Sequence, residues 1–364
     1  MNTIKLPFYA RVALVLFSIV LIFIILSAAA NIFIPLMFAL LIAILLLPLN
    51  NFLERKMRLG KTIAPLLSVS FFISILSGFF YFLTLQIVHF SDDIPALKSR
   101  FLTIYGDIQL WLSSRMHITS RQQTELIEKS ANKLIDAAGQ SLSNVLASVS
   151  GMVFLLVFVF IFSFFILHYR HLLLRFVLNL FSPHNRSQVR EVASETKYMI
   201  NAYISGLVIE MLMIGLVSCS LLLIMDVRYA MLLGAMIALL NVIPYLGFYS
   251  ALLLAFVVTF ANSGINLALQ ASTALFIVHL IDSNVLFPRI IGSRVKMNPF
   301  ITILAVIVGE YLWGVPGMFL FIPIAGIIKL ICERVDGLQA WGILMGVEDK
   351  TVKDKTVPTS EIVS

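Results

Sequence analysis

The sequence predicts an all-α polytopic membrane protein, with about six full transmembrane helices, two re-entrant helical hairpins in an inverted repeat and a small extracytoplasmic helical hairpin. Apolar residues make up 60% of the 364 residues and charged residues only 12%. Soluble domains carry about 25% charged residues. Apolar runs of about 18 residues or more recur along the chain, and a run of that length is typical of a membrane-spanning helix.

Residues 1–90 are predicted to form a scaffold of three transmembrane helices. The first apolar run is Val12–Ala30, and its end, Ser27–Ala30, has the small residues of a signal-peptidase site. A second apolar run, Ile32–Leu49, follows at once, whereas a cleaved signal would be followed by polar sequence. We therefore expect the first helix to be retained. The third helix is expected at Ile63–Phe90.

Residues 91–145 form a sizeable polar region between spans. Apolar residues from Ile94 to Leu112 keep a 3.6-residue period, which predicts an amphipathic helix. Ser120 and Gln123 have the spacing of a capping box that opens a second such helix. We expect an extracytoplasmic hairpin whose apolar faces either pack on each other or form a subunit interface.

The rest of the chain twice repeats a transmembrane helix followed by a broken apolar run. Residues 146–199 hold a fourth helix, Leu146–His168, and then a cytoplasmic amphipathic segment. Residues 200–262 hold a helix at Asn201–Met225 and the broken run Ala230–Ala261.

The second unit, residues 263–335, has the same organisation. It holds a helix at Ile265–Leu286 and the broken run Phe300–Ile331. Residues 336–364 form a polar C-terminal tail. Together the two units predict an inverted repeat whose hairpin tips meet near the membrane midplane.

Pro and Gly interrupt the two broken runs at Asn241–Gly247 and at Trp313–Gly317. Each limb has about 14 residues, or about 21 Å of helix, which is too short for about 30 Å of hydrocarbon. An interrupted helix leaves backbone groups unpaired, so within the hydrocarbon region it is tolerated only where it is buried in protein or lines a water-filled cavity. Two re-entrant hairpins are therefore expected, and paired interruptions of this kind indicate the substrate site of a transporter.

The basic residues give the orientation. Lys and Arg concentrate in the segments Glu54–Lys61, Tyr169–Lys197 and Pro288–Lys296, which we expect to be cytoplasmic together with the N-terminus. A single kinked crossing at Ala230–Ala261 would instead export the third of these segments. The net charge is +7, and the basic residues responsible for it lie at the ends of apolar runs, as membrane topology requires. The sequence therefore predicts a lipid bilayer as partner and no nucleic acid.

Four ionisable residues lie within apolar helices, where such groups are costly and indicate function. They are Glu210, His279, Asp282 and Glu310. Burial favours the protonated form of a carboxyl group, so these groups suit exchange of H+ or Na+. The alternative is a purely structural polar contact between packed helices, with His279 paired to Asp282.

The interruptions add neutral polar groups. Asn241, Asn284 and the carbonyl groups beside Pro244 and Pro316 suit an uncharged polar solute or an ion, and each proline ends a helix by removing a donor. Glycines at the tips permit positive φ or close backbone approach, although a role in the turn alone is the alternative. The predicted substrate or ion site comprises Glu210, Asn241, Pro244, Gly247, Asp282, Asn284, Glu310, Gly314, Pro316 and Gly317.

Signals of an enzyme, a cofactor or a metal site are missing from the sequence. It contains no phosphate-binding Gly-x-x-x-x-Gly-Lys-Ser/Thr run, so ATP hydrolysis is not expected. The two cysteines, Cys219 and Cys332, have neither the spacing of metal ligands nor the number of a disulfide framework.

Four stretches together resemble the autoinducer-2 exporter family of bacterial and archaeal membrane proteins. They are Pro35–Pro48, Arg228–Gly247, Asn284–Pro299 and Leu312–Pro323. The family often has Pro after the first tip glycine, where this chain has Phe248. The matching motif residues that we expect to be structural are Pro35, Pro48, Pro288, Arg289, Pro299 and Pro323.

The resemblance implies an elevator-type exporter in the bacterial cytoplasmic membrane that assembles as a homo-oligomer, a pentamer. Family members are associated with export of autoinducer-2 and others with sodium/proton antiport. The leading hypothesis is thus secondary export of a small polar solute. The alternatives are a sodium or other cation/proton antiporter and a non-transporting membrane scaffold that recruits a partner through residues 91–145.

Overall fold

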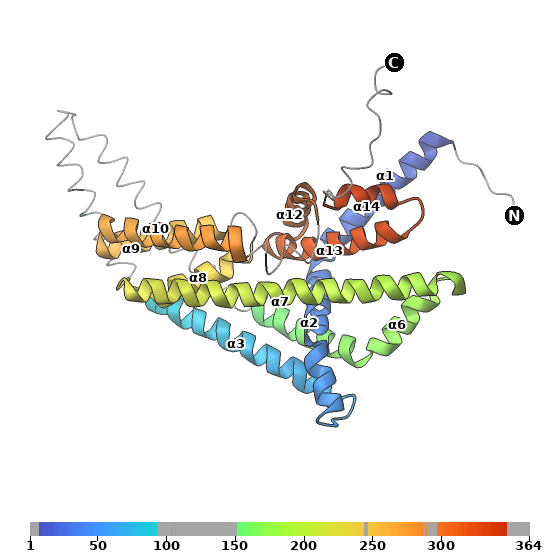
Figure 1. Cartoon of the computed structure of the whole chain (residues 1–364), viewed down its shortest axis with the longest axis horizontal. Coiled ribbons are helices and arrows are strands. Elements are labelled where there is room, and N and C mark those ends of the chain that lie inside the picture. The colour runs from blue at the N-terminus through green and yellow to red at the C-terminus, as the bar shows by residue number, and fades with distance from the viewer. Residues whose placement is uncertain are drawn as a thin grey trace, which may run out of the picture.

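The computed structural model describes residues 7–92, 151–243, 247–286 and 297–347, and the single positions 103, 106 and 289. Within these residues, seven helices are long and apolar enough to cross a membrane, and the ribbon consists of helices joined by short connections (Figure 1). The prediction of an all-α polytopic membrane protein is confirmed. Nearly all of the predicted insert at 91–145, the end of the C-terminal tail, Pro244 and Pro288 lie outside the described residues.

The N-terminal helices follow one another with short connections. Helix α1 (Phe8–Ala28) is joined by Ala29 to α2 (Ala30–Arg55), and α3 spans Ile63–Asp92. None of the residues of α1 is buried, and Figure 1 shows this helix projecting from the body of the molecule. The fourth span, Gly151–His168, packs on α2, where the hydroxyl of Ser163 donates to the carbonyl of Ala39 (3.3 Å).

Pro35 and Pro48 both lie inside α2 without ending it. Proline removes a backbone donor and clashes with the preceding turn, but transmembrane helices tolerate it where neighbouring groups satisfy the freed carbonyls. The amide of Asn201, in the later helix α7 (Arg186–Ile224), donates to the Ile44 carbonyl of α2, four residues before Pro48 (3.3 Å). This bond supplies a donor to a carbonyl that the proline cannot reach.

The predicted start of the fifth helix at Asn201 is wrong. After α6 (Arg170–Asn179) and the 3-10 turn η1 (Pro183–Asn185), the single helix α7 runs from Arg186 to Ile224. Its charged first half was interpreted as a separate cytoplasmic segment. Charged side chains on one face do not end a helix, and the other face buries Met199 and Ile200.

The first broken run forms a helical hairpin. Helix α8 (Ala230–Asn241) packs along α7, and α9 (Gly247–Ser263) returns beside α10 (Ile265–Ile281). Helix α10 continues directly into η2, a π-helical turn at Asp282–Leu286. The prediction of a break at Asn241–Gly247 is confirmed.

The second broken run forms another hairpin, with a shorter break than predicted. Helix α12 (Pro299–Trp313) and α13 (Val315–Arg334) are separated by Gly314 alone and pack closely together. With 20 residues, α13 is long enough to cross a membrane, so three of the four hairpin limbs, α8, α9 and α12, are as short as a re-entrant limb requires. The short helix α14 (Gln339–Met345) folds back on α13.

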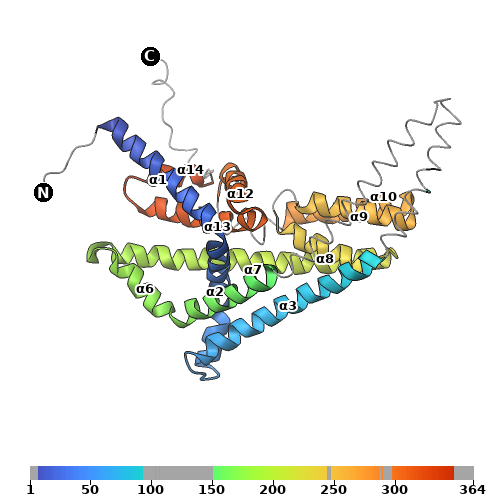
Figure 2. The ribbon, with the colours of Figure 1, turned by 180° about the vertical axis from the view of Figure 1, so that it is seen from behind.

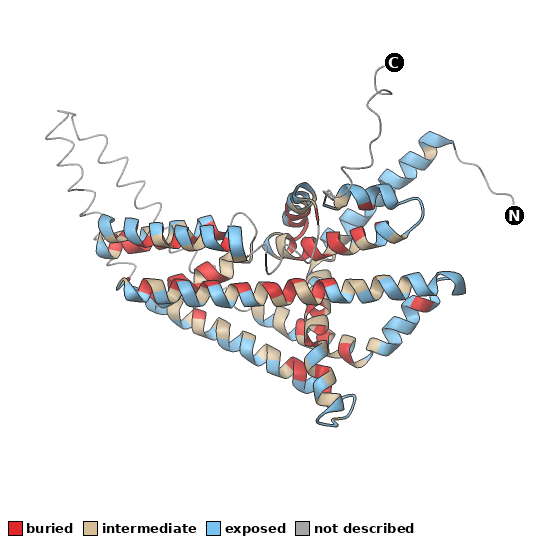
Figure 3. Cartoon of the chain, viewed as in Figure 1, coloured by how far each residue is buried: buried red, intermediate tan, exposed pale blue. Residues whose placement is uncertain are grey.

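Helix α7 carries the two hairpins on its two halves. Figures 1 and 2, seen from opposite sides, place α8, α9 and α10 along one half of α7 and α13 along the other. Figure 3 shows buried residues on α7 where it faces these neighbours, and exposed ones on its free sides.

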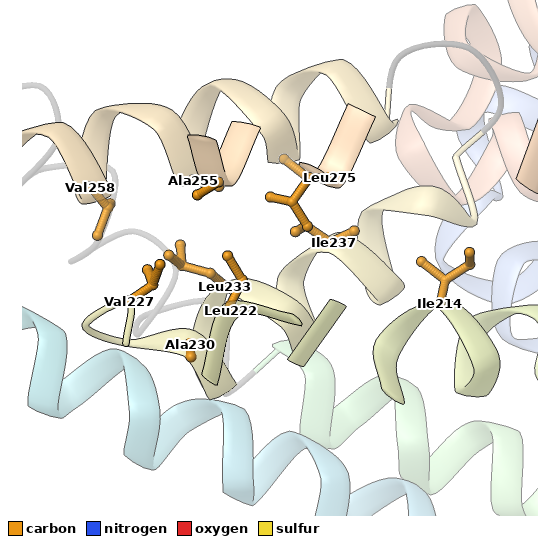
Figure 4. Close-up of a cluster of buried hydrophobic side chains, with 11 residues drawn as sticks. Ile214, Leu222, Val227, Ala230, Leu233, Ile237, Ala255, Val258 and Leu275 are labelled. Atoms are coloured by element: carbon orange, nitrogen blue, oxygen red, sulfur yellow. The ribbon is translucent and has the colours of Figure 1, made fainter. Parts of the chain in front are cut away.

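Each half of α7 has its own core. The second-hairpin core, formed by α2, α7, α12 and α13, contains Tyr203, Trp313 and Leu320 among its buried residues. The first-hairpin core, formed by α7, α8, α9 and α10, is drawn in Figure 4 and contains Leu222, Ile237 and Leu275. The middle of α7 lies between the two cores.

Ion pairs join the ends of several helices. Arg334 at the end of α13 donates to Glu191 (2.7 Å) and Glu195 (2.5 Å) in the first turns of α7. Arg170 at the start of α6 donates to Glu54 near the end of α2 (2.7 Å). Among the segments predicted to be cytoplasmic, those at 54–61 and 169–197 therefore meet through charged groups.

Candidate functional site

The middle of α7 holds a buried carboxyl group. Glu210 lies between the two cores and is only 4% exposed. A charge in such an environment must be paired, hydrogen-bonded or neutralised. The residues that meet Glu210 are therefore the first place to look for a binding site.

Asn241 and Asp282 meet Glu210 from two other elements. The Asn241 amide at the end of α8 lies 3.3 Å from Glu210 Oε1 and 3.2 Å from Asp282 Oδ2. Asp282 is only 3% exposed and is the first residue of the π-helical turn after α10. Glu210 and Asp282 also lie within hydrogen-bonding reach of each other. Three residues far apart in the sequence thus form one cluster, which we call the carboxyl cluster.

The carboxyl cluster is incompletely satisfied. Glu210 Oε2 and Asp282 Oδ1 are buried and have no hydrogen-bond partner among the described residues. The ion pairs of the described residues do not involve either acid. A native structure seldom leaves a buried polar atom unpaired, and such an atom is expected at a site that takes up a proton, an ion or a solute.

A narrow pocket beside the cluster has a mostly apolar wall with a few polar groups. Ile214, Ile237, Leu275, Val278 and Phe248 line it together with Ser218, Asn241, His279 and Asp282, and the described side chains close it against even a water-sized molecule. The His279 ring stacks on Phe248 with 3.7 Å between ring centroids, and its Nε2 lies 3.3 Å from the Ser283 hydroxyl. The contacts of His279 are thus with Phe248 and Ser283, and not only the structural pairing with Asp282 that the sequence offered as the alternative. His279 forms part of the pocket wall.

The first tip is held by close backbone approach. Gly247 opens α9 under the end of α8, where a Cβ atom would lie 1.6 Å from the Leu240 carbonyl oxygen. No larger residue fits there without moving the backbone. The predicted role of Gly247 is thus assigned to close contact rather than to positive φ.

At the second tip the glycines divide the two roles. Gly314 alone separates α12 from α13 and has φ 63° and ψ −145°, a conformation suited to glycine. Gly317 lies inside α13, where a Cβ atom would lie 1.9 Å from the Gly309 carbonyl oxygen of α12. Pro316 stands in the first turn of α13, where its missing donor costs little.

The structure does not bring every predicted residue to the cluster. Glu310 lies on the exposed side of α12, and Asn284 in the π-helical turn donates to its own helix at the Leu280 carbonyl (2.8 Å). Arg289 is also exposed. Pro299 is the first residue of α12, and Pro323 is buried inside α13.

Some residues of the site were not predicted. Ser218 and Phe248 lie in stretches that read only as apolar helix, so nothing in the sequence predicted that they would line the pocket or that Phe248 would stack on His279. Gly309 could have been found, because it and Gly317 flank the turn at Gly314 at a spacing that places them opposite each other in a tight hairpin.

Comparison with known proteins identifies the family. Residues 13–337 match the profile of the AI-2E family of transporters. YueF of Bacillus subtilis strain 168, provisionally named a transport protein, is 25% identical over 313 residues, covering 82% of this chain and 83% of YueF. YhhT of Escherichia coli strain K12, also provisionally named a transport protein, is 23% identical over 344 residues, covering 92% of this chain and 94% of YhhT.

A third relative has a named solute. TqsA of Escherichia coli strain K12, named an AI-2 transport protein, is 30% identical over 131 residues, or 36% of this chain and 38% of TqsA. The family match covers most of the helices that build the two hairpins and the carboxyl cluster. The chain therefore belongs to the AI-2E family of membrane transporters.

Proposed function

We propose that this transporter is a secondary exporter of a small polar solute such as autoinducer-2, and that it works by elevator-like alternating access. The observation that carries the proposal is the buried polar cluster at the middle of α7, beside the tip of the first hairpin and between the cores of both hairpins. Irregular backbone and unpaired polar groups at such a place are typical of a transport site.

The pocket combines a few polar groups with a mostly apolar wall. A hydroxyl at Ser218, an amide at Asn241 and a ring nitrogen at His279 stand beside the flat face of Phe248 and aliphatic side chains. Such a mixture suits a compact solute that has a few polar groups on a small carbon skeleton. Because the described side chains close the pocket, entry requires movement of a neighbouring element, as alternating access demands.

The arrangement of helices supports a moving unit and a scaffold. The first hairpin packs on α7 and α10, and the second packs on α7 and α2, whereas α1 and α3 share less with either core. We propose that α7 and the two hairpins move as a unit against the N-terminal helices, with the contacts of α2 to α7 and α13 as the sliding interface. The exposed apolar surface of α1 is consistent with the proposed homo-oligomer, which the family resemblance implies to be a pentamer in the bacterial cytoplasmic membrane.

The test is export from vesicles of purified protein loaded with autoinducer-2 and, separately, with other small polar solutes. Gly317→Ala should abolish transport because its methyl group would overlap the Gly309 carbonyl oxygen. Gly78→Ala in α3 is the matched control, since nothing lies within 4 Å of its added methyl group.

A second variant tests the site in case Gly317→Ala fails to fold. Asn241→Leu keeps the number and branching of the side-chain heavy atoms but removes the amide, so protein that still assembles should lose transport. Full transport by both Gly317→Ala and Asn241→Leu would contradict the proposed site. Release of none of the solutes by the wild type would contradict the proposed export.

A cation/proton antiporter is the second candidate function, and the observation in its favour is the pair of buried acids. It predicts sodium- or pH-dependent flux in the same vesicles that disappears in Glu210→Gln. The non-transporting scaffold depends on residues 91–145, and no observation on the described residues favours it.

A further inference from the structure

We propose that Glu210 and Asp282 hold a single proton between them, and that Asn241 completes this proton site by donating to both acids. The inference deepens the proposed function and rests on it in one respect, because the proton couples to transport only if the chain carries a solute. The ligand of the carboxyl cluster is then a proton, and the solute occupies the adjoining pocket.

The hydrogen-bond inventory supports one proton. An amide nitrogen has two hydrogens, and that of Asn241 reaches Glu210 Oε1 and Asp282 Oδ2. The remaining oxygens, Glu210 Oε2 and Asp282 Oδ1, are buried and lack a partner among the described residues. A proton on either acid turns that acid into a donor toward the other. One added proton therefore satisfies two unpaired atoms.

The charges support the same conclusion. Two ionised carboxylates in contact repel each other strongly where water is excluded, and a shared proton removes one of the charges. No lysine or arginine is among the described residues that line the adjoining pocket. Among the described residues, neither acid forms an ion pair with a lysine or an arginine.

A metal ion fits the cluster less well. The described residues contain no group of three or more His, Cys, Asp or Glu side chains that could hold a metal ion. Asn241 directs its amide hydrogens toward the acids, whereas an ion bound between them would need its oxygen. The donor arrangement thus selects a proton over Na+.

The surrounding titratable groups are few. On α7, Tyr203 lies two turns before Glu210, and on α10, His279 lies one turn before Asp282. Helix α9 contributes Tyr249, whose ring meets His279 edge-on. Helix α8 carries no titratable residue. His279 stacks on Phe248 and meets Ser283 through Nε2, while its buried Nδ1 has no partner among the described residues. Because Asn241 joins the two acids and not His279, the acids are the groups placed to share the proton.

The position of the site gives the proton a mechanical role. Glu210 belongs to α7, Asn241 ends α8 and Asp282 begins the π-helical turn, so the three side chains join three elements. π-helical turns inside α-helices are frequent at functional sites. Loss of the proton would leave two adjacent charges, one on α7 and one beside α10, whose repulsion favours separation of these elements and entry of water.

Infrared spectroscopy of the purified full-length protein tests the site directly, because a protonated carboxyl group has a carbonyl stretch that a carboxylate lacks. The wild type should retain one protonated carboxyl group per chain at neutral pH, and this signal should titrate in a single step. Glu210→Gln and Asp282→Asn should each remove the signal, since one acid flanked by two amides no longer needs the proton.

Asp226→Asn is the matched control. Asp226 is an exposed acid after the end of α7 with φ 55°, a conformation that Asn tolerates, so this variant should keep the full signal. Melting curves and size-exclusion chromatography identify which of the variants are folded. A wild type without the signal, or a signal that persists in a folded Glu210→Gln or Asp282→Asn protein, would overturn the proton site.

The same measurement separates the two proposals. The infrared signal requires no solute. Its absence from a wild type that exports normally would refute the proton site and leave the proposed function standing. Its presence alongside failure of export for every solute would refute the proposed function and leave the proton site standing.

Discussion

Single glycines decide how closely the helices of this transporter approach each other. Gly234 of α8 lies against Cys219 of α7, where an added Cβ atom would be 2.3 Å from Sγ and 2.7 Å from the backbone nitrogen. Gly309 and Gly317 place α12 against α13 in the same way. Small residues at such crossings let the backbones pack, which drives helix association where lipid removes the hydrophobic effect.

Gly234→Ala should therefore destabilise the protein by about 1–3 kcal/mol, because the overlap is with backbone as well as with a side chain. Gly78→Ala should instead be neutral or raise stability by about 0.5–1 kcal/mol, since alanine is the better helix former and the site is open. Thermal unfolding in detergent measures both. Equal melting temperatures for the two variants would contradict the close packing of α7 and α8.

At the scale of the element, the second hairpin is fixed where it begins and where it ends. The Asn298 side chain accepts from the Phe300 backbone nitrogen (3.0 Å) and so caps α12, which then starts with Pro299. The segment after α14 pairs with the residue before this cap through a bridge between Met297 and Gly346. The bridge thus joins the capped start of α12 to the chain that follows α13.

Replacing the cap tests this arrangement. Asn298→Ala should lower stability by about 1 kcal/mol, because the donor at the start of α12 loses its partner, while Asn298→Ser should restore most of it. The comparison requires unfolding curves for the two variants beside the wild type. The cap would be unimportant if the alanine variant matched the serine variant.

At the scale of the whole molecule, the two hairpins predict a distinctive topology. In a re-entrant arrangement, both ends of the first hairpin lie on one side of the membrane and both ends of the second lie on the other. Asp226 and Ser263 bracket the first hairpin, and both are exposed. Arg58 and Asp336 are exposed in segments that we expect on the cytoplasmic side.

Labelling with a membrane-impermeant thiol reagent tests this topology. Cys219 and Cys332 are first replaced by alanine, and single cysteines are then placed at 226, 263, 58 and 336. Intact cells should label 226 and 263 alone, and opened cells should label all four. Labelling of 226 and 263 from opposite sides would show a straight crossing and remove the first re-entrant hairpin.

The sequence was sufficient for features that depend on local chemistry. Pro and Gly inside membrane-length apolar runs located both hairpins, and the cost of a buried acid singled out Glu210 and Asp282. It was insufficient where tertiary packing decides. The start of α7 at Arg186 was missed because a charged amphipathic stretch looks like an interfacial segment until Met199 and Ile200 find their partners.

The direction of a side chain is the other limit. Glu310 and Glu210 have the same signature of an acid in an apolar helix, yet Glu310 lies on the exposed face of α12 and Glu210 is buried. Helices apolar on every side give no periodicity from which to choose the face that packs. The meeting of Asn241 with both acids likewise depends on three elements that are separated along the chain.

The unbroken length of α7 has a consequence for how the two hairpins can move. A helix of 39 residues is about 58 Å long, and it forms part of the core of each hairpin. A rigid helix shared by both cores ties the movement of one hairpin to that of the other. We therefore expect the two hairpins to shift together, as one body, whenever α7 moves.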